Sequence, residues 1–506
     1  MKITRCNGIL LHPTSLPGPH GIGSLGEEAF QFVDFLAETG QGVWQVLPLN
    51  PTGYGDSPYN AFSAFAGNPL LIDLRELVSL GDLDQSDIAG LPVSTDPHRV
   101  DYGWVTHYKE ELLLRKAAAN FKANATAQRR REFEAFREHQ GYWLWDYARF
   151  RALRDHFDGA SWNRWPSELR HRDPQALAKW DEQLTDEIFW RLYAQHIFFS
   201  QWFALKEYAN NKGIRIFGDL PIFVAYDSVD VWANQHLFHL DEEGEPTLVA
   251  GVPPDYFSDD GQRWGNPLYH WDRMAAQGYS WWIARFRWNL AQADIVRIDH
   301  FRGFEACWAI PAEEKTAVNG EWMEGPGGGL FEALASTLGE VPIVAEDLGL
   351  ITPEVEELRD RFAFPGMKVL HFAFDGGPDN PYLPHNIERN SVVYTGTHDN
   401  DTTLGWWNSR SKKEKDAVRA YLGHGLHHMP WDLIRTAMSS VANLCIIPMQ
   451  DILELDSDGR MNRPGQGSGN WDWRFSRGQL TQTRTGTLKK MTTLYGRITE
   501  NDATDS

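Results

Sequence analysis

The feature that most constrains the fold is a set of eight short apolar runs, several rich in β-branched residues, that end at polar or charged residues. Runs of this kind are typical of strands buried on both faces of a parallel sheet. Helical patterns, with apolar residues three and four positions apart, occupy most of the intervals between them. The runs are residues 8–12, 42–48, 214–221, 295–298, 342–345, 367–374, 391–395 and 444–449.

Eight strands alternating with helices, without a series of antiparallel hairpins, predict an α/β fold: one (β/α)8 TIM barrel with large helical and loop insertions. The whole chain, residues 1–506, is expected to form this single catalytic domain. Helical periodicity predicts an insertion from about 81 to 190. Residues from about 241 to 271 show little periodicity, which favours an active-site loop insertion. A doubly wound sheet is the alternative, but no glycine-rich dinucleotide turn follows the first run.

The overall charge and the cysteines exclude several kinds of partner. A net charge of −21 disfavours nucleic acids and anionic membranes, because both require a basic face. Cys6, Cys307 and Cys445 form no metal-binding spacing and no disulfide framework, and we predict neither a metal nor a cofactor. No apolar leader or 18-residue apolar run occurs, so we expect a cytoplasmic enzyme, although an organellar one would look the same. The oligomeric state stays open.

Aromatic residues make up 13% of the chain, and some of them lie in polar loops instead of in predicted core segments. Examples are Tyr54, Tyr59, Tyr256, Phe257 and Trp264, which neighbour glycine, proline and aspartate. Rings beside carboxylates suit sugars, whose C–H faces pack on aromatic rings while their hydroxyls take hydrogen bonds. The composition therefore favours a carbohydrate substrate.

Four acidic residues close four different predicted strands: Asp219, Asp299, Glu346 and Asp399. In a (β/α)8 barrel the carboxyl ends of the strands surround one mouth, where active sites are built. Converging acids suit glycosidic chemistry, in which one carboxylate attacks the anomeric carbon and a second carboxyl transfers the proton. In retaining enzymes the two carboxyl groups lie about 5–5.5 Å apart.

Neighbouring residues and strand position indicate different roles for Asp299 and Glu346. Arg297 shares a strand face with Asp299 and would keep that aspartate ionised and oriented. Glu346 ends an apolar strand, where partial desolvation would raise its pKa toward an acid/base role. His398 could hydrogen-bond sugar hydroxyls, although a histidine at a strand end is about as often simply packed. We therefore expect Asp299 to be a reacting group.

Three segments resemble the catalytic motifs of the 4-α-glucanotransferases of glycoside hydrolase family 77, the amylomaltases or disproportionating enzymes of the α-amylase clan. They are Arg-Ile-Asp-His-Phe-Arg at 297–302, Glu-Asp-Leu-Gly at 346–349 and Thr-His-Asp-Asn-Asp at 397–401. The resemblance extends over almost the whole chain. It includes residues 53–59, 218–222, 251–267, 380–386 and 469–474.

This resemblance implies that segments of α-1,4-glucan move to the 4-hydroxyl of an acceptor glucan or glucose by retaining double displacement. Suitable substrates would be maltooligosaccharides, amylose, and starch or glycogen dextrins. The resemblance implies Asp299 as nucleophile, Glu346 as acid/base and Asp399 as the carboxylate that stabilises the transition state. It also implies an acceptor-side loop carrying Asp259, a second glucan surface at Tyr54, and sugar contacts from Ser57, Tyr59, Asp219, Gln262, Trp264, Arg297, His398 and Asn470.

Transfer instead of hydrolysis requires that the glycosyl-enzyme meet a sugar hydroxyl before water, which favours a covered, aromatic acceptor site. Tyr256, Phe257 and Trp264 could form one. An α-glucan hydrolase of the same clan would share the three acids and is the first alternative. A non-catalytic glucan-binding protein would need only the aromatic residues. A metal-dependent barrel hydrolase is disfavoured because His12 and His20 are too far apart for one coordination face.

Overall fold

A computed structural model describes residues 3–91, 96–254, 258–423 and 428–498. Its centre is a sheet of eight parallel strands in the order β10-β11-β12-β1-β2-β3-β6-β9. Every run predicted as a strand contains one of them. They are β1 (Cys6–Leu10), β2 (Val43–Gln45), β3 (Arg215–Pro221), β6 (Ile295–Asp299), β9 (Ile343–Ala345), β10 (Gly366–Val369), β11 (Ser391–Tyr394) and β12 (Leu444–Pro448).

The sheet closes into a barrel between its first and last strands. The Ala345 N–H in β9 donates to the Pro365 carbonyl, just before β10, at 2.9 Å. Gly8 in β1 shows how tightly the strands pack, because a Cβ there would lie 2.6 Å from the Val43 carbonyl oxygen of the neighbouring strand. The predicted (β/α)8 barrel is confirmed.

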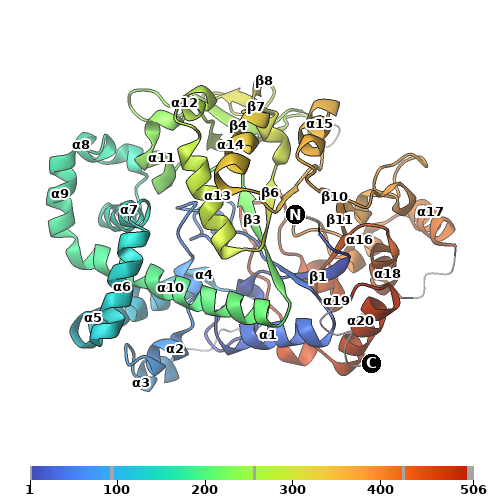
Figure 1. Ribbon diagram of the computed structural model, residues 1–506, viewed down its shortest axis with the longest axis horizontal. Coiled ribbons are helices and arrows are strands. Elements are labelled where there is room, and N and C mark those ends of the chain that lie inside the picture. Colours follow the sequence, from blue (N-terminus) through green and yellow to red (C-terminus); the bar gives the residue numbers. More distant parts are fainter. Residues whose placement is uncertain (1–2, 92–95, 255–257, 424–427, 499–506) are drawn as a thin grey trace.

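Helices surround the strands, as the periodicity predicted, and cover the barrel wall (Figure 1). Much of their inward surface is apolar and buried, for instance Phe32, Val33 and Leu36 of the first helix. The helices between or after barrel strands include α1 (Glu27–Glu38), α2 (Leu74–Ser79), α10 (Thr185–Asn211), α13 (Ser280–Gln292), α14 (Gly328–Leu338), α15 (Pro353–Arg361), α16 (Thr403–Ser409), α17 (Lys412–Leu422), α18 (Trp431–Ser439), α19 (Met449–Ile452) and α20 (Gln482–Leu494).

One connection departs from the alternation that we predicted. Between β10 and β11 the chain forms only short 3-10 turns, at Leu370–Phe372 and Pro384–Asn386. This segment contains Gly376, Gly377 and Pro378, and such a sequence disfavours a helix because glycine is flexible and proline lacks an N–H.

The region predicted as a helical insertion, about 81–190, is largely helical and lies to one side of the barrel (Figure 1). Four of its helices, α5, α6, α7 and α9, pack on α10, which is buried along much of its length. One continuous cluster of buried side chains includes both the barrel and these helices. The helices are α3 (Gln85–Ala89), α4 (Tyr102–Thr106), a π-helix at His107–Leu114, α5 (Arg115–Asn124), α6 (Ala127–His139), α7 (Leu144–His156), α8 (Ser167–Arg170) and α9 (Pro174–Gln183).

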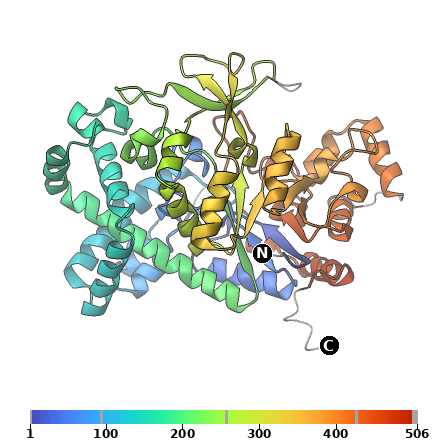
Figure 2. The same cartoon turned by 45° about the horizontal axis from the view of Figure 1, so that its top comes forward.

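A second, antiparallel sheet projects beyond the barrel mouth, in yellow and green at the top of Figure 2, and our expectation of no antiparallel series was wrong here. Two of its strands lie in the 241–271 segment, which we expected to have little regular structure. The sequence shows no clear alternation of apolar and polar residues here, because β5 is polar and largely exposed. The β4–β5 pairing also shifts register between Val249 and Gly251. The strands are β4 (Leu248–Val252), β5 (Gln262–Pro267), β7 (Ala306–Pro311) and β8 (Glu321–Glu324).

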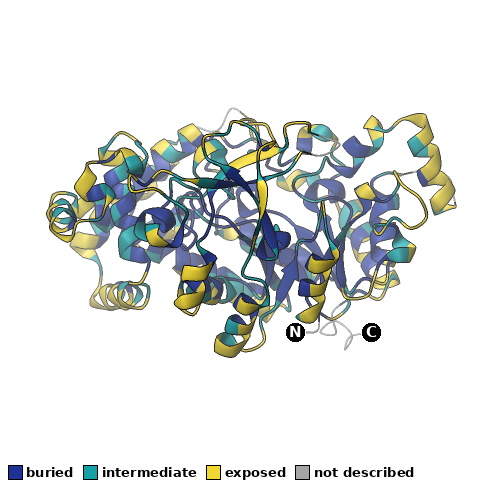
Figure 3. Cartoon of the chain, turned by 90° about the horizontal axis from the view of Figure 1, so that it is seen from above, coloured by how far each residue is buried: buried dark blue, intermediate teal, exposed yellow. Residues whose placement is uncertain are grey.

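Burial follows the layers of the molecule. The barrel strands are buried, while the outward faces of the surrounding helices are exposed (Figure 3). Two short helices, α11 (Val229–Ala233) and α12 (Trp271–Ala276), both pack against the 3-10 turn at Gln235–Leu237. Among the described helices, none combines the length and the apolar composition that a membrane span requires.

Candidate active site

The three acids predicted to carry the chemistry follow three barrel strands at the same end. Asp299 is the last residue of β6, Glu346 comes directly after β9, and Asp399 lies in the loop that follows β11. Ile298 pairs with Ala345 between the parallel strands β6 and β9, so the two strands end side by side. Asp299 and Glu346 are therefore neighbours at the mouth of the barrel.

Arg297 lies at the centre of the buried charges. Its Nη1 donates to both carboxylate oxygens of Asp219, at 2.9 and 2.7 Å, and its Nη2 lies 2.8 Å from Oδ1 of Asp299. Burial alone would lower the pKa of the Arg297 guanidinium, but Asp219 and Asp299 together raise it above its ordinary value. One cation thus orients two carboxylates from adjacent strands.

The Asp219 side chain is fully buried beneath the mouth. Burial raises the pKa of its carboxyl group, and Arg297 opposes that shift. The Tyr59 hydroxyl donates to Asp219 Oδ2 at 2.7 Å. Burial, and then the charge of Asp219, raise the pKa of Tyr59 well above its ordinary value, so this tyrosine stays a donor. Asp219 therefore acts as a support that fixes Tyr59 and Arg297.

Glu346 is held by backbone groups. The His300 N–H donates to Oε2 at 2.7 Å and the Leu348 N–H donates to Oε1 at 3.0 Å. His300 has φ 53°, a left-handed conformation that L-residues rarely adopt. This conformation aims its N–H at the carboxyl group, and such local strain is typical of functional sites.

Desolvation in the mouth raises the pKa of Glu346 to about 8, and the charge of Asp299 adds to the shift. Arg297 and the two backbone donors oppose it without cancelling it. Most of the Glu346 population is therefore protonated at neutral pH, whereas its neighbour Asp299 is paired with a guanidinium. One of two adjacent carboxyl groups can donate a proton while the other can act as an anion.

The His398–Asp399 pair continues the mouth on its other side. The His398 ring stacks on Tyr59, with centroids 5.2 Å apart and an interplanar angle of 11°. His398 Nε2 lies 3.5 Å from Asp399 Oδ1, and Asn462 Nδ2 donates to the same oxygen at 2.6 Å. Tyr59 therefore connects Asp219 with the Asp399 side, and a continuous chain of contacts joins the predicted catalytic residues.

The predicted acceptor-side residues Trp264 and Asp259 and the predicted sugar contact Gln262 lie on and beside β5. Gln262 and Trp264 are exposed, and the Trp264 indole N–H donates to the Gln262 side-chain oxygen at 3.1 Å. The Trp264 ring meets the His300 ring edge to face at 4.8 Å, which places it beside the catalytic loop. Asp259 is exposed in the turn before β5. Tyr256 and Phe257 lie outside the described residues.

Three other predicted contacts have different surroundings. The Asn470 side chain is committed to its own loop, since its oxygen accepts from Arg463 N–H at 2.9 Å and its nitrogen donates to the Gln466 carbonyl at 2.8 Å. Ser57 Oγ accepts from the Tyr59 N–H at 3.2 Å and so shapes the turn that presents that ring. Tyr54 is 81% exposed at the rim.

Sequence reasoning missed three contributors: Arg460, Asn462 and Trp471. Arg460 donates to the Asp399 carbonyl at 2.6 Å, and Trp471, at φ 65°, lies against the rings of Tyr59 and His398. All three lie in the segment after β12, more than 60 residues from Asp399 and still further from Tyr59. Trp471 and Asn470 share a run that the family resemblance pointed to, but no local pattern indicates Arg460 or Asn462.

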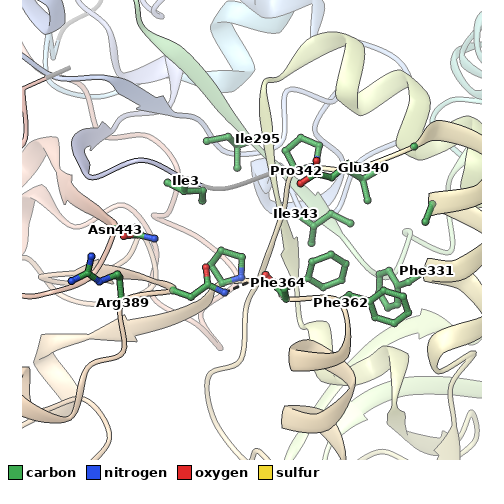
Figure 4. A pocket seen from close by; sticks show the side chains of 16 residues that line it. Ile3, Ile295, Phe331, Glu340, Pro342, Ile343, Phe362, Phe364, Arg389 and Asn443 are labelled. Carbon is green, nitrogen blue, oxygen red and sulfur yellow. Dashed lines mark hydrogen bonds between the residues drawn. The ribbon is translucent and has the colours of Figure 1, made fainter. Parts of the chain in front are cut away.

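A cavity of about 500 Å³ lies at the opposite end of the barrel and is not part of this mouth (Figure 4). Ile295 and Ile343, which begin β6 and β9, line it, and most of its wall is apolar. Asp299 lies four residues further along β6, about 13 Å away at 3.3 Å per residue. Within the described part of the chain, no three histidine, cysteine, aspartate or glutamate side chains are grouped as metal ligands.

A (β/α)8 barrel whose rim holds an arginine-paired aspartate, a protonated glutamic acid and a third acid defines a class, the enzymes that break and remake glycosidic bonds with carboxyl groups. Comparison with known proteins gives the particular family. The family model described as 4-alpha-glucanotransferase, glycoside hydrolase family 77, matches residues 11–481. The chain belongs to this family and is a 4-α-glucanotransferase.

Relatives match along the whole length. The 4-alpha-glucanotransferase of Synechocystis sp. is 54% identical over 500 residues, covering 97% of this chain and 98% of the relative. That of Thermus thermophilus is 53% identical over 499 residues, covering 97% and 99%. The amylomaltase of Streptococcus agalactiae, solved with acarbose, superposes with a TM-score of 0.95 at 41% identity, covering 98% of this chain and all of that one.

Proposed function

We propose that this 4-α-glucanotransferase moves segments of α-1,4-glucan to the 4-hydroxyl of an acceptor glucan or glucose by a retaining double displacement. Asp299 is the nucleophile, Glu346 the acid/base and Asp399 the carboxylate that stabilises the transition state. The observation that carries this proposal is the pair of adjacent carboxyl groups, of which burial keeps Glu346 protonated while Arg297 orients Asp299 as an anion.

In the first step, Asp299 attacks the anomeric carbon while Glu346 gives its proton to the departing glycosidic oxygen. Glu346 is then an anion, and the N–H groups of His300 and Leu348 already point at its oxygens. The acceptor 4-hydroxyl next loses its proton to Glu346 as it attacks the glycosyl-enzyme. The ester bond to Asp299 breaks, and both carboxyl groups return to their initial states.

Asp399 stabilises the positive charge that develops on the sugar ring in each step. The sugar ring carries partial positive charge in both transition states, and a nearby carboxylate lowers their energy. The side chain of Asp399 is 46% exposed toward solvent. Among the described residues it contacts no arginine side chain that would neutralise it, since Arg460 reaches only its backbone carbonyl. Asp399 is therefore suited to this role.

The substrates we propose are maltooligosaccharides, amylose, and starch or glycogen dextrins. The Streptococcus agalactiae amylomaltase was solved in complex with acarbose, and its close structural match supports an α-glucan ligand here. The bond within its own loop uses one N–H of the Asn470 amide, which leaves the second for a sugar hydroxyl. Sugar contacts come from Ser57, Tyr59, Gln262, Trp264, Arg297, His398 and Asn470, with Asp219 as a support. Trp264 and the loop carrying Asp259 form the acceptor side, where an aromatic cover would favour a sugar over water.

The organisation we propose is one catalytic barrel, residues 1–506, with a helical insertion at about 81–190 and an active-site insertion at about 241–271. The continuous buried core across barrel and helices supports a single domain. We propose the cytoplasm as its location, which cell fractionation would test.

Incubation with maltotriose tests the function. A transferase should produce glucose together with longer maltooligosaccharides while the number of reducing ends stays constant. Glu346→Gln and Asp299→Asn should each lower kcat by at least 10³-fold, while binding of a maltooligosaccharide to either variant stays within a few-fold of the native value. Reducing ends that increase with turnover would show hydrolysis instead, and full activity of either variant would refute the assigned roles.

A further inference from the structure

Asp399 is held differently from the other two acids. Asp299 ends a strand and Glu346 directly follows one, so the barrel itself places them. Asp399 lies in the loop after β11, and its side chain is 46% exposed against 29% for Asp299. A carboxylate in a loop with this exposure could rotate unless another group fixed it.

The side chain of Asn462 holds the Asp399 carboxylate by a hydrogen bond. Its Nδ2 donates to Asp399 Oδ1 at 2.6 Å, shorter than the 3.5 Å between that oxygen and His398 Nε2. The Asn462 backbone N–H also donates to the His398 carbonyl at 3.1 Å. Arg460 completes the contact by donating to the Asp399 carbonyl at 2.6 Å. The 460–462 segment therefore holds both the backbone and the carboxylate of Asp399.

We propose that Asn462 is a positioning residue for the transferase reaction, which fixes the Asp399 carboxylate without neutralising it. A lysine or arginine here would orient Asp399 equally well, but its charge would offset the negative potential that stabilises the transition state. A neutral amide supplies the hydrogen bond and leaves that potential intact. This inference rests on the role proposed above for Asp399.

The loop does not need the Asn462 side chain for its own shape. Its backbone N–H already joins the 460–462 segment to His398, and Trp471 N–H donates to the Met461 carbonyl at 2.8 Å. The Asn462 amide directs its short hydrogen bond to Asp399. Truncating that side chain therefore separates positioning of Asp399 from folding of the loop.

The test is steady-state kinetics of Asn462→Ala and Asn462→Asp with maltotriose. We expect Asn462→Ala to lower kcat by about 10- to 100-fold with KM changed less than threefold. Asn462→Asp should be worse at neutral pH because of like-charge repulsion. It should recover as the pH falls, because the new carboxyl group, once protonated, again donates a hydrogen bond to Asp399. The matched control is Asn210→Ala, whose amide donates at 2.8 Å to the carboxylate of Asp294, just before β6 at the other end of the barrel; its kcat should be native.

A double-mutant cycle decides between positioning and a general structural role. The assay uses α-maltosyl fluoride as donor, because its reactive leaving group makes slow variants measurable. In this assay Asn462→Ala should change the rate less than threefold when Asp399→Asn is already present. Equal losses in both backgrounds, or a native rate for Asn462→Ala alone, would overturn the inference. A native rate for Asp399→Asn would instead refute the proposed role of Asp399 itself, so the two failures are distinguishable.

Discussion

The two halves of the barrel mouth are built in different ways. The strand side consists of residues at the ends of β3, β6 and β9: Asp219, Arg297, Asp299 and Glu346. The loop side consists of residues in the connections after β11 and β12: His398, Asp399, Asn462, Asn470 and Trp471. Strand pairing fixes the first group, whereas hydrogen bonds and ring contacts between distant segments fix the second.

The chemistry differs accordingly. On the strand side, one guanidinium compensates two aspartates, and burial keeps Glu346 protonated. On the loop side, a neutral amide and aromatic rings surround Asp399, whose carboxylate forms no ion pair with an arginine or lysine among the described residues. The strand side thus supplies a rigid nucleophile and acid, and the loop side supplies an electrostatic field and the shape of the sugar site. The following predictions test that division.

The largest effect should come from breaking the strand side with Arg297→Met. This change leaves Asp219 and Asp299 without their cation, and removing one partner of a buried charge pair costs about 3–5 kcal/mol. We expect kcat to fall by at least about 10³-fold and thermal stability to fall markedly, as measured by steady-state assays and calorimetry.

Arg149→Met is the matched control, because Arg149 also contacts two aspartates, Asp146 and Asp181, but lies in the helical insertion. It should lower stability and leave kcat within about twofold. If Arg297→Met behaved in the same way, the central position of Arg297 would be structural and not catalytic.

The strand side could be predicted from the sequence for a physical reason. The run 295–298, with three β-branched residues, stops at Asp299 and so places that residue at the sheet edge, and parallel strands end on one side. Asp219, Arg297 and Glu346 follow from the same rule. The barrel strands and most helices could be predicted because each has its own local periodicity.

The loop side could not be predicted in this way. The contact between Asn462 and Asp399 joins segments 63 residues apart that no repeating pattern connects. The left-handed conformation of Trp471 depends on the surrounding packing, since a bulky residue rarely adopts φ > 0. The antiparallel sheet was missed because its strands are short, because β5 and β8 are polar, and because the β4–β5 pairing is irregular in register.

The second largest effect should be a pH dependence of kcat/KM that arises from Glu346 on the strand side. Because the reacting form of Glu346 is protonated and its pKa is about 8, kcat/KM for maltotriose should fall about tenfold per pH unit above 8. The fluoride donor needs no protonation of its leaving group, so the rate of its glycosylation step should lose this alkaline decline. An alkaline decline of equal size with both donors would assign it to another group.

The raised pKa of Glu346 should also make the stability of the folded protein depend on pH. The native state retains a proton on Glu346 that the unfolded chain releases above about pH 4.5, so this carboxyl lowers stability progressively as the pH rises from 4.5 to 8. Glu346→Gln should therefore unfold at a higher temperature than the native enzyme at pH 7 and at nearly the same temperature at pH 4.

A smaller effect is expected where the two sides meet, at Tyr59. Tyr59→Phe removes the hydroxyl that donates to Asp219 but keeps the ring that stacks on His398. Loss of a hydrogen bond to a charged group costs about 1.5–3 kcal/mol, so we expect kcat/KM to fall about 10- to 100-fold. Tyr108→Phe, which removes a buried hydroxyl bonded to the His20 carbonyl, should destabilise the protein without changing kcat. A similar result for both would make Tyr59 a packing residue.

The smallest effect is expected at the outer edge of the loop side, at Tyr54. Its ring is 81% exposed, and its hydroxyl lies 3.8 Å from the position that a Cβ at Gly467 would occupy, so it borders the loop after the 460–462 segment. Tyr54→Ala should leave maltotriose kinetics unchanged and raise KM for amylose several-fold, because only a long chain would reach a ring at the rim. Tyr142→Ala, another exposed tyrosine but in the helical insertion, should change neither. An equal loss with maltotriose and amylose would place Tyr54 inside the catalytic mouth. It would contradict the prediction that Tyr54 only helps to bind long chains.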